Sequence, residues 1–489
     1  MEKNTGIINT DYVSRKATAQ IEVECELKAD DPISSLLGVT SDAVALTVEA
    51  LGEEASVTGR VNFKALYLTE DGDIEALDYY SDFKTRIEGE VDATSKLFAF
   101  GKVLDTEVLD TSESVVKARA VVEIEIIGVS KRAVTCEEGE NFCKKTATVK
   151  ESVLKEVAEG VFDVGEDFES GERVEKIVLL TTDLVLKEGK PSRGSLLVSG
   201  TAIADLAYKT ESGIKTLSLS LPFCEELEGE NVTPLDDVYL YGYIKDARIV
   251  LSGAEDDTDI RVELSVALRV PVFGVEEKEV TVDTYSTECA VEIKREEGEC
   301  YLKSGNWNYE ERLSVSCVLP EEMTSIARII MIATPSDNVE SVTSSSDKTT
   351  LLGSFTALLV YEDLDGIVRS YPLDLPYSVT FPTVGSVEEG ETYVRSAVCE
   401  VTGVAKRSRE VEIMYVLKLY AYQCVRKRFT YVSEIREIEE GTSDKKPITI
   451  YKKREGEDSW DIAKSLRVPV EDIDGSGEKY VVCYRQLRE

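Results

Sequence analysis

The chain has 489 residues, which is enough for roughly three ordinary domains. Its 94 Asp and Glu against 56 Lys and Arg give a formal net charge of −38 at pH 7, a balance that argues against a nucleic-acid binder because phosphate backbones are held by basic surface. Histidine is absent, which excludes Ser-His-Asp triads and metal sites that need imidazole. Together these counts favour a binding or assembly protein over an enzyme.

The N-terminal stretch MEKNTGIINTDYVSRKATAQ contains no apolar run long enough for a signal peptide. Elsewhere the sequence has no apolar run of about 18 residues, so we expect no transmembrane segment. We therefore expect a cytoplasmic protein whose ten cysteines are reduced thiols. The cysteines include no CxxC pair, and we expect neither a metal site nor a cofactor.

Three segments, starting at Ser56, Leu197 and Leu351, share one spacing pattern. A Gly precedes a Tyr by eight residues, a second Gly follows five residues later, and an aromatic residue closes the segment. The matched sets are Gly59, Tyr67, Gly72 and Phe83; Gly200, Tyr208, Gly213 and Phe223; and Gly353, Tyr361, Gly366 and Tyr377. Apolar and polar residues alternate through each segment, which predicts a β-hairpin whose second Gly takes a positive φ. The leading Gly indicates a bulge or a close backbone approach.

The similarity extends to both sides of each hairpin, so the repeating units are whole domains. We predict a mainly β chain with three antiparallel, sandwich-like repeats at residues 1–144, 145–305 and 306–435, followed by a linker at 436–447. Helix is sparse in this reading. Its best candidate within the repeats is ESVLKEVAE at 151–159.

The last forty residues follow a different pattern. A short strand at 448–451 leads to Gly456 and then to Asp458, which we expect to cap a helix that carries Trp460. A second short helix at 468–473 and a closing strand at 480–484 complete a β–α–α–β order. The helical spacing of Trp460 favours a core position over stacking on a sugar ring.

This C-terminal order resembles a LysM domain. The matching residues are Gly456, Trp460, Ile462, Ala463, Val468, Val470 and Ile473. In that family two loops form a groove for N-acetylglucosamine chains, and both loops are changed here, at Glu457-Asp458 and at Asp474-Gly475. The resemblance implies a binding surface on these loops, with candidate residues Lys452, Arg454, Glu455, Gly456, Glu457, Asp458, Asp472 and Asp474.

Three such repeats followed by a LysM resemble the SPOCS-domain coat morphogenetic proteins, of SipL type, of spore-forming Firmicutes (Clostridia). The resemblance implies a location in the mother-cell cytosol at the forespore surface, within the spore coat. It also implies a protein partner, a coat-basement ATPase like stage IV sporulation protein A, contacted through the LysM domain. Other coat proteins, or further copies of this chain, are additional expected partners.

A basic island interrupts the acidic chain, because residues 395–430 hold eight basic residues against three acidic ones. One interpretation is a solvated hairpin surface, and the other is a docking patch for an acidic partner or an anionic membrane. The candidate residues are Lys406, Arg407, Arg409, Arg426, Lys427 and Arg428.

Three functional hypotheses remain open on the sequence. The leading one is a non-enzymatic scaffold that docks the coat-basement protein to the forespore surface. The second is a protein that binds peptidoglycan or N-acetylglucosamine chains through its LysM domain. The third is a structural coat protein that assembles with itself through its repeats.

Overall fold

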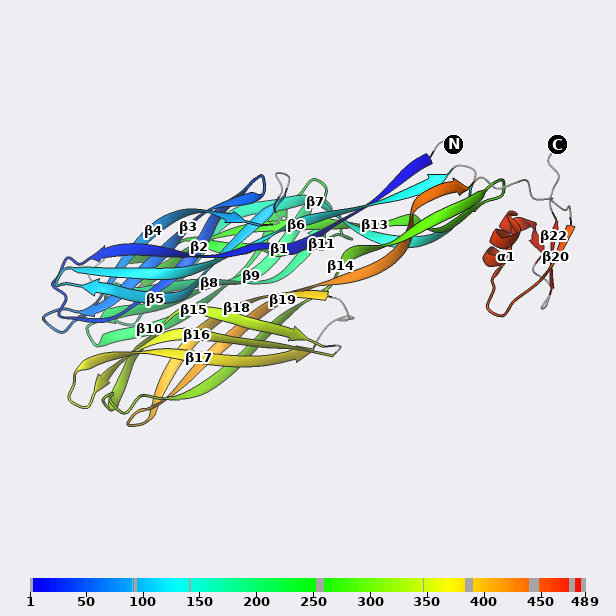
Figure 1. Ribbon diagram of the computed structural model, residues 1–489. Coiled ribbons are helices and arrows are strands. Elements are labelled where there is room, and N and C mark those ends of the chain that lie inside the picture. The colour runs from blue at the N-terminus through cyan, green and yellow to red at the C-terminus, as the bar shows by residue number, and fades with distance from the viewer. Residues whose placement is uncertain are drawn as a thin grey trace.

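The computed structural model describes residues 3–89, 91, 95–139, 142–251, 259–345, 347–382, 390–438, 448–474 and 480–484. Over these ranges the chain is mainly β, as the sequence predicts, and it forms antiparallel sheets with a single α-helix near the C-terminal end. Three β repeats form an elongated body, and a small C-terminal module lies beyond one end of it (Figure 1).

The first repeat consists of two three-stranded sheets packed face to face. Its strands are β1 (Lys3–Lys28), β2 (Ser35–Leu51), β3 (Glu54–Leu68), β4 (Ile74–Glu88), β5 (Leu97–Thr111) and β6 (Val115–Gly139). One sheet has the order β1-β6-β5 and the other β2-β3-β4. Val61, Phe63 and Ala65 of β3 are buried between the sheets, because successive side chains of a strand point to opposite faces.

The second and third repeats have the same topology. The second contains β7 (Phe142–Glu169), β8 (Val174–Ser192), β9 (Ser195–Thr210), β10 (Gly213–Glu228), β11 (Asp237–Val238), β12 (Gly242–Leu251) and β13 (Asp259–Ser286). The third contains β14 (Ala290–Val318), β15 (Ile326–Ser344), β16 (Lys348–Asp363), β17 (Val368–Pro382), β18 (Gly390–Arg407) and β19 (Glu410–Ile438). Each repeat pairs its first and last strands, and a hairpin of its third and fourth strands lies in the opposite sheet. In the second repeat β11 and β12 together take the place of β5.

The spacing pattern of the sequence is explained by cross-strand contacts. The leading glycine of each hairpin lies directly opposite the closing aromatic residue, in the pairs Gly59–Phe83, Gly200–Phe223 and Gly353–Tyr377. A register shift next to each of these glycines marks a β-bulge in the neighbouring strand. The turn glycines Gly72, Gly213 and Gly366 have φ values of 83°, 117° and 77°, so the prediction of positive φ is confirmed. The matched tyrosines, Tyr67, Tyr208 and Tyr361, are all buried.

The three repeats pack against one another through shared apolar clusters. The core of the second repeat continues into the first repeat at Val13 and into the third at Tyr420. A separate cluster gathers Leu66, Ala207 and Val360, each of which precedes the matched tyrosine of its own repeat. Because equivalent positions meet, the repeats are arranged about an approximate threefold axis. Together they form one body.

Beyond the sheets, the first and last strands of each repeat continue as a two-stranded ribbon. We call the three ribbons together the stalk: residues 3–14 with 128–139, 142–153 with 274–286, and 290–301 with 426–438. At about 3.3 Å per residue each ribbon is roughly 40 Å long. A register shift at residue 16, 155 or 304 marks where each ribbon leaves the body, as expected because bulges bend strands. The ribbons twist together toward the N-terminal end of β1 (Figure 1).

Buried contacts hold the three ribbons of the stalk together. One apolar cluster contains Ile8, Val134 and Cys136 of the first ribbon, Val149 and Val280 of the second, and Cys300 and Tyr431 of the third. The rings of Tyr12 and Tyr301 stack with centroids 3.7 Å apart. The buried carboxylate of Glu151 accepts a hydrogen bond from the backbone N–H of Asn9 at 2.9 Å, so polar groups also join the ribbons.

The C-terminal module consists of β20 (Ile448–Lys452), α1 (Ser459–Leu466), the 3₁₀ turn η1 (Val470–Asp472), β21 (Ile473–Asp474) and β22 (Tyr480–Tyr484). The first strand, the helix and the closing strand lie where the sequence predicts them. Asp458 caps α1 through a capping box with Asp461, which confirms that part of the prediction. The second helix is only a single 3₁₀ turn, and Ile473 belongs to a strand that pairs with β22.

The predicted boundaries between repeats fall inside strands. The boundary at 144/145 lies in β7, the one at 305/306 lies in β14, and residue 435 lies in β19. Structurally the units are 3–139, 142–286 and 290–438, because each repeat is closed by its own long ribbon. Most of the expected linker, from 439 to 447, lies outside the described residues.

The helix predicted at 151–159 is wrong, since this segment belongs to β7. Lys155 is an extra residue opposite the step from Val272 to Phe273 of β13. This bulge interrupts the alternation of apolar and polar residues, and the interrupted pattern imitates helical spacing. Pairing of β7 with β13 over the whole segment overrides the local preference.

Candidate functional site

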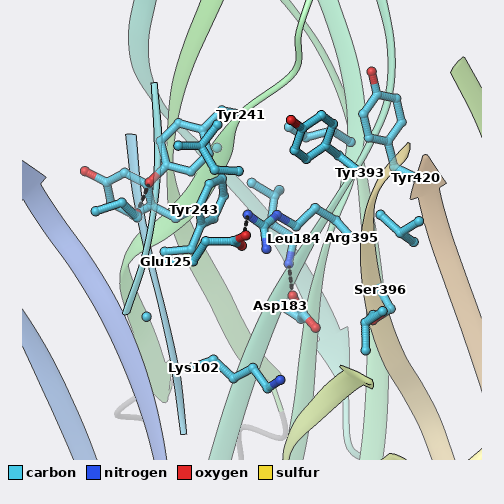
Figure 2. A pocket seen from close by; sticks show the side chains of 18 of the residues that line it. Lys102, Glu125, Asp183, Leu184, Tyr241, Tyr243, Tyr393, Arg395, Ser396 and Tyr420 are labelled. Carbon is cyan, nitrogen blue, oxygen red and sulfur yellow. Dashed lines mark hydrogen bonds and ion pairs between the residues drawn. The ribbon is translucent and has the colours of Figure 1, made fainter. Parts of the chain in front are cut away.

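A cavity of about 500 Å³ lies where the three repeats meet. Strands of all three line it: β5 and β6 of the first repeat, β8 and β12 of the second, and β18 of the third. Its wall combines the aromatic rings of Phe100, Tyr241 and Tyr243 with charged groups such as Glu125 and Arg395. Figure 2 shows Arg395 and Glu125 pointing toward each other across this space.

The polar groups of the cavity connect one repeat to another. Arg395 of the third repeat lies over the Phe100 ring at 3.2 Å and 3.8 Å from the carboxylate of Glu125. The same carboxylate pairs with Arg15 at 2.5 Å. Tyr241 of the second repeat donates its hydroxyl proton to the carbonyl of Ala99 at 2.9 Å, and burial raises the pKa of this phenol. These contacts join the repeats to one another across the cavity. The side chains that form them therefore stabilise the body.

Most of the candidate loop residues of the C-terminal module precede α1, whereas Asp472 and Asp474 follow it. Gly456 has a φ of 86°, a conformation that L side chains rarely adopt. Glu457 accepts hydrogen bonds from the Tyr451 hydroxyl at 3.1 Å and from the Arg454 backbone N–H at 2.9 Å, so it stabilises the turn before the helix. Lys452, Arg454 and Glu455 are exposed. Their exposure leaves them accessible to a partner.

The remaining candidates of the module, Asp472, Asp474 and Asp458, have different surroundings. Asp472 lies half-buried in η1, and the side chain of Asp474 lies outside the described residues. Asp458 is not free for a ligand, because its carboxylate caps α1 and also pairs with Lys145 of the stalk at 3.0 Å. The hydrogen bond from the Asp461 backbone N–H and the nearby Lys145 ammonium lower the pKa of Asp458.

The module packs on the tip of the second ribbon of the stalk. The indole N–H of Trp460 donates to Asp283 at 2.8 Å, and the ammonium of Lys464 donates to the same carboxylate at 2.6 Å. Burial alone would raise the pKa of Asp283, but the hydrogen bonds from Lys464 and Trp460 outweigh it and lower that pKa. The Tyr285 hydroxyl donates to the carbonyl of Val468 at 2.6 Å. Trp460 therefore packs against another part of the chain as well as within its own module.

The structure does not bring the basic candidates together in one patch. Lys406, Arg407 and Arg409 surround the turn between β18 and β19, where Lys406 pairs with Glu412 at 2.5 Å. Arg426, Lys427 and Arg428 lie at the base of the stalk, and Glu299 pairs with Arg426 at 3.4 Å and with Arg428 at 3.6 Å. About 16 residues of extended β19 separate the two groups, which is roughly 50 Å. Closeness in sequence thus does not produce a common surface.

Sequence reasoning missed the residues that join separate parts of the chain. Asp283, Tyr285 and Lys145 hold the module, and Arg395 and Glu125 join the third repeat to the first. Each is a single charged or aromatic residue within an ordinary strand pattern. No local signal distinguishes such residues, because their partners lie more than a hundred positions away.

No protein-family model matches this sequence, and no curated protein matches it. Among the described residues no cluster of three or more Cys, Asp or Glu side chains has the arrangement of a metal site. No helix in the described ranges has the length and apolar character to cross a membrane.

Proposed function

We propose that this chain is a non-enzymatic adaptor of spore-coat morphogenesis, of the SPOCS–LysM type. In this proposal the three repeats act as a rigid body, and the C-terminal module binds a coat-basement ATPase like stage IV sporulation protein A. The site of action is the forespore surface in the mother-cell cytosol. The family resemblance of the sequence supplies the identity of the partner.

The observation that carries the proposal is the position of the module at the end of a long stalk. A stalk of about 40 Å separates the module from the cavity where the repeats meet. Lys452, Arg454 and Glu455 are exposed on the module, whereas Asp458 pairs with Lys145 of the stalk. A body that presents a small module at one end is suited to bridging two surfaces.

The cavity supports the same proposal from its chemistry. Glu125 forms ion pairs with two guanidinium groups, and Tyr241 donates a hydrogen bond to a backbone carbonyl. These groups therefore stabilise the contact between repeats. General acid–base chemistry needs a titratable group held within reach of a substrate. The arrangement at Glu125 and Tyr241 favours a structural joint.

The test is a titration of the purified chain with the purified coat-basement ATPase. A triple variant, Lys452→Glu, Arg454→Glu and Asp472→Lys, changes only residues of the module, two of them exposed and Asp472 half-buried. We expect it to weaken binding at least tenfold with an unchanged circular dichroism spectrum. Lys190→Glu is a matched control, because it makes the same net change of charge at an exposed position of β8 in the body. We expect this control to bind like wild type.

Two results would contradict the proposal. The first is a triple variant that binds the ATPase as tightly as the wild-type chain. The second is retention on insoluble peptidoglycan combined with no binding to the ATPase, which would favour the glycan-binding alternative. The peptidoglycan assay uses the same preparations of the wild-type chain and the triple variant as the ATPase titration, so the two results can be compared directly.

A further inference from the structure

The carboxylate of Asp283 gathers three cationic or N–H donors at the tip of the stalk. Two come from α1 of the module, namely the Trp460 indole and the Lys464 ammonium. The third is the guanidinium of Arg295, on the neighbouring ribbon, at 2.6 Å. Charge-assisted hydrogen bonds of this kind are stronger than neutral ones. Asp283 therefore fixes α1 onto the end of the stalk through residues of both its first and its last turn.

Apolar packing surrounds this polar contact. Tyr285 forms one buried cluster with Ala463, Val468 and Cys483 of the module. Its ring meets the Trp460 ring edge-on, with centroids 5.0 Å apart. The hydroxyl of Tyr285 is also satisfied, since it donates to the Val468 carbonyl. The contact thus combines a small apolar core with hydrogen bonds and ion pairs between polar groups of the stalk and of the module.

The contact lies at the start of α1, where the candidate loop at 452–458 ends. The indole nitrogen of Trp460 has a single proton to donate, and Asp283 accepts it. At the same end of the helix, Asp458 pairs with Lys145. A partner that packs on this end of α1 must displace the stalk.

We infer that the stalk tip is an intramolecular docking site that shields the Trp460 end of α1 and competes with a protein partner for it. The competition with a partner rests on the proposed function, whereas the docking contact does not. If the docked form dominates, the apparent dissociation constant equals the intrinsic one divided by the undocked fraction. A docked fraction of nine-tenths would weaken partner binding about tenfold.

The docking contact is tested by the accessibility of Trp460 in the full-length chain. The sequence has only two tryptophans, and the indole N–H of the other, Trp307, has no hydrogen-bond partner in the described part of the chain. Trp307→Phe therefore leaves Trp460 as the single tryptophan at small cost, and its emission can be excited selectively over that of the 22 tyrosines. In this background we expect Asp283→Ala to raise the acrylamide quenching constant of Trp460 at least twofold.

Two further variants make the test specific. Tyr285→Phe keeps the ring and removes the hydroxyl that donates to the Val468 carbonyl, so we expect a smaller rise in quenching. This variant keeps the test valid in case Asp283→Ala disturbs the stalk itself. Asp167→Ala is the matched control, since it removes a carboxylate that pairs with Arg261 in the body, away from the module. Equal quenching in wild type, Asp283→Ala and Tyr285→Phe would overturn the docking site.

The competition is read from binding of the same proteins to the purified coat-basement ATPase. We expect Asp283→Ala to bind three- to tenfold more tightly than wild type, while Asp167→Ala binds like wild type. Raised quenching with unchanged or weaker binding would overturn the competition. Raised quenching with no binding by any of the proteins would support the docking site and contradict the proposed function, so the two failures are distinguishable.

Discussion

Gly200 lies directly opposite Phe223 across the β9–β10 hairpin, and a Cβ built on Gly200 would lie 2.5 Å from Cζ of that ring. On its other side the same Cβ would lie 2.8 Å from the carbonyl oxygen of Val185. Gly59 and Phe83 repeat this relationship in the first repeat, with 2.3 Å to the ring. The ring covers the glycine, and no side chain larger than hydrogen fits beneath it.

Gly200→Ala is expected to destabilise the chain by about 1–3 kcal/mol, the usual cost of overpacking. The backbone oxygen of Val185 cannot move aside as a side chain can. The measurement is the free energy of unfolding from urea titration, with Thr216→Ala, at an exposed position of β10, as control. Combining Gly200→Ala with Phe223→Ala should recover part of the loss, and strictly additive effects would contradict the contact.

Asp363 is expected to hold the turn between β16 and β17. Its buried carboxylate accepts hydrogen bonds from the backbone N–H groups of Asp365 and Ile367, at 3.0 and 2.9 Å, and from Arg369 at 2.9 Å. Asp363→Ala should lower the melting temperature by several degrees, whereas Asp365→Ala, at an exposed position of the same turn, should change it little.

The effect of Asp363→Ala should depend on pH. The hydrogen bond from Arg369, followed by the one from the Ile367 backbone, lowers the pKa of Asp363 below its ordinary 3.8. A carboxyl group with a depressed pKa contributes stability above its unfolded pKa and loses it as the pH falls through its folded pKa. The difference between wild type and variant should narrow below pH 3.8. A constant difference down to pH 2 would show that the charge of Asp363 is not what stabilises the turn.

Asp205 should give the opposite dependence on pH. It lies half-buried on β9 beside the third repeat, and burial raises its pKa from 3.8 to about 6 despite the hydrogen bond from Ser218. Ionisation in the folded chain is then unfavourable, so its contribution to stability falls as the pH rises from 3.8 to about 6. Asp205→Asn keeps the acceptor for Ser218 and should be more stable than wild type at pH 8, by about 1–3 kcal/mol.

This advantage of Asp205→Asn should disappear as the pH is lowered to about 4, because the wild-type carboxyl is then neutral. Urea titrations at several pH values measure it, with Asp163→Asn, on an exposed position of β7, as control. An advantage that persists unchanged at pH 4 would mean that the buried charge is not its cause.

The stacked pair of Tyr12 and Tyr301 should hold the stalk locally. Tyr301→Ala removes a ring contact between the first and third ribbons, a kind of contact worth about 0.5–1.5 kcal/mol beyond its buried area. Hydrogen exchange should become faster in 3–14 and 290–301 while β3 and β16 stay protected. Tyr80→Ala, which removes an exposed ring of β4, should leave the stalk unchanged. Equal exchange of the stalk in both variants would contradict this role.

Much of each repeat could be predicted from local sequence. Alternation predicts the strands, and the turn glycines Gly72, Gly213 and Gly366 predict the hairpins, because both signals act within a few residues. The cap of α1 by Asp458 is likewise local. Local sequence does not predict how the three repeats pack against one another. A bulge such as the one at Lys155 redirects a whole ribbon, yet it shows in the sequence only as an interrupted alternation.

Local patterns reach equally far in the C-terminal module. The position of the module within the chain and the residues before its helix follow from the sequence. That Trp460 donates to Asp283 depends on a contact across 177 positions, and no pattern within the module encodes it. The two basic groups around Arg409 and Arg426 show the reverse case, in which residues of one short sequence segment are held far apart by an extended strand.

The three repeats form one body that is held together by shared apolar clusters. Hydrogen exchange of Gly200→Ala tests it most directly, because the change lies only in the second repeat. Shared apolar clusters couple the repeats, so protection should fall together in β3, β9 and β16, each in a different repeat. Loss of protection confined to β8, β9 and β10, with β3 and β16 unchanged, would contradict the claim.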